Sequence, residues 1–186
     1  MSEITELLQR AGDGDAQALD AVFQALYPEL RRLAQARLAG AGGQLSPTVL
    51  VHEVYLRLVG NEGLSINDRG HFFACAAKAM RHIAIDELRR DLAAKRGGGQ
   101  GAVTLDENLS ELAMAGNSDL LAVSQALDVL GELNPRQKQV VELRFFAGLE
   151  FQEIADLLGC SLRTTKREWE RARAFLYAQL ADAPGG

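Results

Sequence analysis

The chain has 186 residues, of which 47% are apolar and 24% are charged, with a formal net charge of −5. This composition is typical of a folded, water-soluble protein and excludes a long disordered chain, and the negative net charge argues against a protein that coats nucleic acid by bulk electrostatic attraction. No apolar run approaches the ~20 residues of a membrane span and the N-terminus lacks a signal-peptide pattern, so we expect a cytoplasmic protein that does not contact a membrane.

Two helical patterns precede residue 40. A short amphipathic helix is expected over residues 3–11, and the turn sequence GDGD follows it. Asp15 is a suitable N-cap for a longer helix, in which Pro28 predicts a bend. The glycine-rich stretch GAGG at 40–43 ends that helix.

The third helix is expected over residues 47–59, where Ser46 is a suitable N-cap and Pro47 occupies the first helical position. On a helical wheel, Val49 and Leu56 lie between the inward and outward arcs and are bracketed by polar residues, as in a surface that binds a partner. The alternative is that this pair packs under the polar loop at 60–70. Five other apolar residues form the inward arc: Leu50, Val51, Val54, Tyr55 and Leu58.

A long helix is expected from His71 to about Arg96, and it is rich in basic residues toward its end. Phe72 and Phe73 lie at its start, and we expect them in the core rather than as a stacking platform for bases. The glycine-rich stretch GGGQG and the residues after it, 97–118, predict a flexible linker. Residues 97–135 contain six acids and no basic residue, a composition that an ordinary solvated tether can have.

Four more helical patterns follow, at residues 119–131, 135–147, 150–158 and 161–180. Asn134, Pro135 and Gln137 predict a capping box at the second of them. Gly159 suits a left-handed residue that ends a helix, and Ser161 suits the cap of the next, so a helix-turn-helix is expected. No alternating strand pattern is present, and the fold class we predict is all-α with two small helical domains.

The last helix separates its residues into two faces. Leu162, Thr165, Trp169, Ala172 and Leu176 fall on one side, and Arg163, Thr164, Arg167 and Arg171 fall on the other. Arginines at this spacing near the start of a recognition helix are suited to guanine edges and to phosphates in a major groove. The alternative is a solvated cationic face, but the preceding turn favours DNA contact.

These residues carry a resemblance to a known family. The stretch ALDVLGELNPRQKQVVELRFFAGLEFQEIADLLGCSLRTTKREWERARAFL resembles the promoter-reading C-terminal domain of bacterial extracytoplasmic-function (ECF) sigma factors. FFACAAKAMRHIAIDELRR resembles their promoter-melting helix and LVHEVYLRL their polymerase-binding helix. The three stretches occur in the family's order and cover nearly the whole chain.

The resemblance implies a polymerase-binding and promoter-melting domain at residues 1–96, an acidic linker at 97–118, an upstream-element domain at 119–183 and a tail at 184–186. It implies core RNA polymerase as a partner, through the clamp helices of its largest subunit and its flap region, together with promoter DNA. It also implies that the acidic linker extends toward the polymerase cleft and the RNA exit path, because a negatively charged segment can occupy a channel that binds nucleic acid; the alternative is the solvated tether. No cofactor, metal or catalytic role is expected, and the residues do not specify an anti-sigma protein.

The resemblance also assigns candidate residues to each contact. Polymerase binding maps to Val49, Leu50, His52, Glu53, Leu56 and Arg57. Promoter melting and DNA just upstream of the start map to Asn67, Asp68, Arg69, Lys78, Arg81, Arg89 and Arg90. The far-upstream element maps to Ser161, Arg163, Thr164, Lys166, Arg167 and Arg171.

The chain departs from the family at the start of the third helix. Relatives carry several carboxylates there, whereas this chain has Ser46, Pro47, Thr48 and Val49 and keeps only Glu53. We hypothesise that a Ser/Thr kinase restores negative charge by phosphorylating Thr48, or less readily Ser46, because a helix N-terminus favours anions. The alternative is that Ser46 is an N-cap and Thr48 an ordinary first-turn residue.

Rival functions are poorly supported by the residues. His52-Glu53 lacks the second histidine of a zinc-protease helix, and GGGQG lacks the Lys-Ser/Thr of a phosphate loop. His71 and Cys75 share a helix face but do not make a zinc site by themselves. The stronger rival is a conventional helix-turn-helix regulator that binds duplex DNA as a dimer without polymerase. Cys75 and Cys160 are expected to be reduced thiols.

Overall fold

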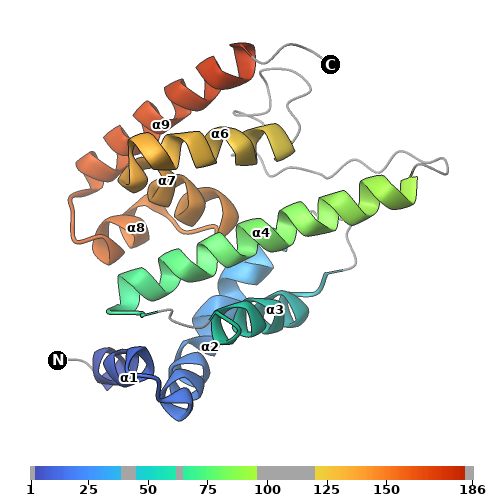
Figure 1. Ribbon diagram of the computed structural model, residues 1–186. Coiled ribbons are helices and arrows are strands. Elements are labelled where there is room, and N and C mark those ends of the chain that lie inside the picture. The colour runs from blue at the N-terminus through green and yellow to red at the C-terminus, as the bar shows by residue number, and fades with distance from the viewer. Residues whose placement is uncertain (1–2, 39–44, 62–64, 96–119, 183–186) are drawn as a thin grey trace.

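The computed structural model describes residues 3–38, 45–61, 65–95 and 120–182, and every regular element in these segments is helical (Figure 1). The all-α prediction is therefore confirmed. The elements are α1 Glu3–Gly12, α2 Ala16–Leu38, α3 Pro47–Val59, α4 Arg69–Lys95, α6 Leu120–Leu133, α7 Pro135–Val141, the π-helical turn η1 Glu142–Phe146, α8 Phe151–Leu157 and α9 Leu162–Asp182.

Helices α1 to α4 form the N-terminal bundle. Phe23 of α2 packs edge-to-face on Tyr55 of α3 and on Phe72 of α4, with ring centroids 4.9 and 5.3 Å apart. Phe72 and Phe73 have no exposed surface, which confirms their prediction as core residues. Burying an aromatic side chain of this size contributes about 2–3 kcal/mol, so these rings set how α2, α3 and α4 pack together.

The predicted helix starts are present in this bundle. Asp15 Oδ1 accepts a hydrogen bond from the Ala18 N–H at 3.1 Å, and Ser46 Oγ accepts one from the Val49 N–H at 3.2 Å. Both side chains satisfy amides that have no partner within the helix. Helix α2 continues through Pro28 to Leu38.

Helices α6 to α9, with η1, form the C-terminal bundle. Trp169 of α9 packs edge-to-face on Phe151 of α8 at 5.8 Å between ring centroids, and Leu127 and Leu176 are fully buried beneath. Asn134 caps α7 by accepting the Gln137 N–H at 3.1 Å. The rest of the predicted capping box is wrong, because Gln137 Nε2 donates to Glu168 Oε2 of α9 at 3.0 Å instead.

The pattern at 135–147 predicts one helix, but the structure divides it. Helix α7 ends at Val141, and the chain widens into the π-helical turn η1, where the Ala147 N–H donates to the Glu142 carbonyl at 3.1 Å. Single π turns of this kind are rare and often accompany functional positions. The wider turn buries Glu142, Leu143, Phe145 and Phe146 together.

The two bundles pack against each other, with α4 between them. Helices α1 to α3 lie on one side of α4, while η1 and α6 lie on the other (Figure 1). One apolar cluster includes buried residues of both bundles. The predicted linker at 97–118, the domain boundaries beside it and the tail at 184–186 lie outside the described residues.

Smaller predictions can also be compared with the structure. Cys75 and Cys160 are free thiols, as expected, and burial raises the pKa of the Cys75 thiol. Within the described segments, no cluster of His, Cys, Asp or Glu is arranged to hold a metal ion. None of the helices described is long and apolar enough to cross a membrane.

Candidate nucleic-acid interface

The helix-turn-helix is built from α8, a tight turn and α9. Gly159 adopts a φ of 61°, a left-handed conformation that costs a glycine little. The Cys160 N–H closes the turn by donating to the Ala155 carbonyl at 3.0 Å. Ser161 then caps α9, because its Oγ accepts the Thr164 N–H at 3.1 Å. The predicted motif is therefore present with the predicted glycine and cap.

The inward face of α9 is made up of residues that the helical wheel predicted to lie there. Thr165, Trp169, Ala172 and Leu176 are buried. The hydroxyl of Thr165 donates to the Ser161 carbonyl at 3.2 Å and lies 3.2 Å from the Cys160 sulfur. A buried hydroxyl with a partner costs little, so Thr165 is accommodated without strain on the fold.

The outward face of α9 carries exposed cations. Arg171 lies 3.8 Å from Glu168, a long and weak ion pair. Within the described part of the chain, the side chains of Arg163, Lys166 and Arg167 form no ion pair with the protein. Cations held on a rigid helix without a partner are available to phosphates and base edges. The exposed members of the predicted set are Ser161, Arg163, Lys166, Arg167 and Arg171, with Thr164 half-buried.

A second group of cations lies along α4. Lys78, Arg89 and Arg90 are exposed. Arg89 and Arg90 face Asp86 and Glu87 one turn earlier on the same helix. Exposed pairs of this type contribute little stability and are screened by salt. These two arginines can therefore exchange an intrahelical carboxylate for a phosphate at small cost.

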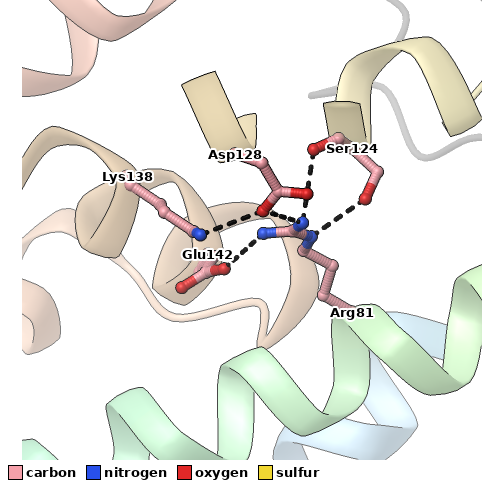
Figure 2. Close-up of polar contacts among 5 residues, drawn as sticks. All are labelled: Arg81, Ser124, Asp128, Lys138 and Glu142. Carbon is pink, nitrogen blue, oxygen red and sulfur yellow. Dashed lines mark hydrogen bonds and ion pairs between the residues drawn. The ribbon is translucent and has the colours of Figure 1, made fainter. Parts of the chain in front are cut away.

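Arg81 behaves differently from the other α4 cations. Its side chain is 2% exposed, and its guanidinium donates to Glu142 and Asp128 of the C-terminal bundle at 2.8 and 2.6 Å (Figure 2). The phosphate contact predicted for Arg81 is therefore not available in this arrangement, because the C-terminal bundle covers the side chain. Sequence reasoning missed Glu142 as a partner; the only signal was a lone acid between Val141 and Leu143, two apolar residues.

The three polar residues predicted to hold a base, at the junction between the loop and α4, are all exposed. Asp68 Oδ1 accepts the His71 N–H at 2.8 Å and so caps α4, while Arg69 pairs with Glu29 of α2. Asn67 donates its backbone N–H to His71 Nδ1 at 3.4 Å. Each therefore has a structural role, and a role toward a base stays a prediction.

Helix α3 presents an apolar strip to solvent. Val49, Leu56 and Val59 are 46%, 48% and 47% exposed. The described residues of the loop that follows α3 therefore do not cover Val49 and Leu56, the pair predicted to bind a partner. His52 is exposed and Glu53 half-buried.

Two other residues of the predicted polymerase set face the fold instead. Leu50 is only 4% exposed, so its prediction as a contact residue needs correction: it faces the core and supports the strip from behind. Arg57 is half-buried and forms an ion pair with Asp86 of α4 at 2.5 Å.

The first turn of α3 holds no acid, as the sequence indicates. Ser46 is occupied as the N-cap, whereas the side chain of Thr48 is exposed. The free amides of this turn and the helix dipole favour an anion at this end.

A cleft of about 590 Å³ with mixed polar and apolar lining opens between α3, α4 and α7, and His82 lines it. Partial burial lowers the pKa of His82, and the positive charges of Arg81, Lys78 and Arg57 lower it further. These surroundings therefore disfavour a positive charge on the imidazole.

Comparisons with known proteins agree with this geometry. A family model described as ECF sigma factor matches residues 1–182. The chain is 27% identical over 186 residues to the ECF RNA polymerase sigma factor BldN of Streptomyces coelicolor, covering 97% of this chain and 67% of that protein. It is 29% identical over 103 residues to the RNA polymerase sigma factor SigV of Bacillus subtilis, covering 55% of this chain and 57% of that protein.

Proposed function

The chain belongs to the family of ECF sigma factors, and we propose that three of its helices divide the work of transcription initiation. As an alternative sigma factor it directs the start of transcription, with core RNA polymerase and promoter DNA as its partners. This role is one of binding and positioning rather than catalysis. Because its partners are the polymerase and the chromosome, we place its site of action in the cytoplasm.

Helix α9 reads the far-upstream promoter element. The observation that carries this assignment is a set of cations, Arg163, Lys166 and Arg167, that form no ion pair with the described residues and lie on the exposed face of a helix that follows the Gly159 turn. A double change of Arg163 and Arg167 to alanine should weaken promoter binding at least tenfold, since each bidentate base contact is worth about 1–3 kcal/mol. Arg136, an exposed arginine outside α9, is the matched control.

Helix α3 binds the clamp helices of the largest polymerase subunit. Its exposed strip, formed by Val49, Leu56 and Val59, is an apolar surface that a partner can desolvate. Replacing Val49 and Leu56 with glutamate should reduce retention by core polymerase in a pull-down. Val129 of α6 is 43% exposed, so Val129→Glu tests whether adding a charge elsewhere has the same effect.

Helix α4 and residues 65–68 before it meet DNA just upstream of the start. Lys78, Arg89 and Arg90 supply exposed positive charge, and a polar loop beside a cationic helix suits an unstacked base. Lys78→Ala should lower promoter opening without lowering polymerase binding. The C-terminal bundle additionally faces the flap region of the polymerase.

A Ser/Thr kinase regulates the first turn of α3. Thr48 is exposed there, and this turn contains no acid. A phosphate at Thr48 adds up to about two negative charges beside free amides. Thr48→Glu should bind polymerase better than the unmodified chain, and Thr48→Ala should remove any gain that a kinase confers; if both variants match the parent with and without kinase, the switch does not exist.

A further inference from the structure

A buried polar cluster joins the two bundles at Arg81 (Figure 2). The guanidinium donates from Nε to Ser124 Oγ at 3.1 Å and from one terminal nitrogen to Glu142 Oε1 at 2.8 Å. The other terminal nitrogen donates to Asp128 Oδ1 at 2.6 Å and to the Ser124 carbonyl at 3.2 Å. Lys138 Nζ approaches Asp128 to 3.1 Å. Among the described residues, the three that accept from Arg81 all belong to the C-terminal bundle, and none belongs to the bundle that carries Arg81.

The charges in this cluster depend on each other. Glu142 is buried, and its burial raises the pKa of its carboxyl group against the opposing effect of Arg81. Partial burial also tends to raise the pKa of Asp128, but hydrogen bonds from Arg81 and Lys138 outweigh it and hold that pKa below its ordinary value. A buried arginine without acids, or a buried acid without the arginine, is strongly unfavourable. The cluster is therefore stable only while the two bundles are docked.

Docking covers the middle of the cationic face of α4. At about 100° per residue, Lys78, Arg81 and Arg89 lie within about 80° of one another around the helix. η1 and α6 pack on α4 at the position of Arg81. A duplex or strand that follows this face would meet the C-terminal bundle, so α4 cannot offer all three cations to DNA while the bundles are docked.

Two further contacts hold the bundles in this arrangement. Arg32 of α2 forms an ion pair with Glu153 of α8 at 2.6 Å. Gly70, at the start of α4, lies so close to α8 that a Cβ atom there would be 2.4 Å from the Leu157 carbonyl oxygen. The backbones meet at a distance that only glycine permits, which indicates a specific interface rather than a loose encounter.

We propose that the docked arrangement is a resting, autoinhibited form, in which Glu142 and Asp128 hold Arg81 until promoter phosphates replace them. This inference rests on the proposed assignment of α4 to promoter DNA. Arg81 exchanges its carboxylate partners for phosphates, and separation of the bundles lets water reach Glu142, so neither charge stays buried without a partner. The exposed strip on α3 stays accessible in the docked form, so polymerase binding can precede release.

The test removes the acids and leaves Arg81 in place. A double Glu142→Gln, Asp128→Asn variant preserves side-chain volume but leaves the buried guanidinium without a counter-charge. A matched control, Glu132→Gln with Asp156→Asn, removes two exposed acids of the same bundle outside the cluster. Small-angle scattering measures the radius of gyration, about 16 Å for a compact chain of this length, and titration with duplex DNA measures affinity. Circular dichroism verifies that both variants keep their helices.

The cluster variant should show a larger radius of gyration than the parent and a gain in DNA affinity of at least tenfold over the matched control. Adding Arg81→Met to it removes the unpaired charge and should restore the compact radius, which also shows that the bundles remain folded. An unchanged radius in the cluster variant overturns the proposal, and so does a larger radius with no more affinity than the control. If the parent fails to start transcription with core polymerase, the proposed function fails, whereas the scattering result stands by itself.

Discussion

Gly70→Ala should weaken the docking of the two bundles and at the same time stabilise the N-terminal bundle, so it distinguishes the two effects. An added Cβ would lie 2.4 Å from the Leu157 carbonyl oxygen, against 3.4 Å for an ordinary contact, so the backbones must move apart by about 1 Å. The neighbour is backbone and not a flexible side chain. Overpacking of this kind costs about 1–3 kcal/mol, which disfavours docking at least about fivefold.

The same change should stabilise the isolated bundle. Gly70 lies within α4 and lacks a positive φ, so alanine fits its backbone. Replacing glycine by alanine in a helix is favourable by up to about 1 kcal/mol. Gly12→Ala is the matched control, since a Cβ there meets the Ser65 Oγ side-chain atom at 3.3 Å and not the other bundle.

Small-angle scattering measures whether the two bundles separate, and thermal unfolding measures whether the added methyl group stabilises the N-terminal bundle. Gly70→Ala should raise the radius of gyration while the helix content stays the same, and Gly12→Ala should leave the radius unchanged. If Gly70→Ala stays compact and keeps the parental affinity for DNA, the close approach of α4 to α8 does not stabilise the docked form, and the prediction is wrong.

Three further predictions concern single positions. Thr165→Val should change the free energy of unfolding by less than about 1 kcal/mol in a urea titration, because the hydroxyl bonds only locally; a larger loss would mean that the Cys160–Thr165 contact matters more. Ser46→Ala should cost about 1 kcal/mol by losing the cap to Val49, and a kinase response that survives it would assign the switch to Thr48. The pKa of His82 is lowered from 6.5 in the fold, so the native state favours the neutral imidazole. The contribution of His82 to the free energy of unfolding is complete above pH 6.5 and is lost as the pH falls through the folded pKa. The melting temperature should therefore drop less between pH 7.5 and 5.5 in His82→Gln than in the parent, and equal drops would exclude His82 as the cause.

The parts of the structure that follow from local rules were predictable from the sequence. Asp15, Ser46 and Ser161 cap their helices because their short oxygens satisfy the nearest free amides, which needs no tertiary information. Gly159 ends α8 for a similarly local reason. The two faces of α9 follow from its period alone, and so does the exposure of Val49 and Leu56 on α3.

What the sequence did not reveal depends on contacts between distant segments. Arg81 lies on the same face as Lys78, and only the packing of η1 and α6 on α4 distinguishes a buried arginine from an exposed lysine. Gln137 has the right spacing for a capping box, but Glu168 of another helix competes for its amide. The π turn at Glu142–Phe146 has no signal that the helical period could detect, and η1 packs on α4, which lies far away in the sequence.

The sigma-factor function is tested by transcription with core polymerase on genomic DNA of the source organism, with and without this protein. The 5′ ends of the transcripts are then sequenced. The experiment uses the unmodified chain and a form phosphorylated at Thr48. We expect a discrete set of start sites that requires the protein and disappears when Arg163 and Arg167 are both alanine. If neither form produces start sites beyond those of core polymerase alone, and the protein instead protects palindromic duplex sites without polymerase, the protein acts as a conventional helix-turn-helix regulator and not as a sigma factor.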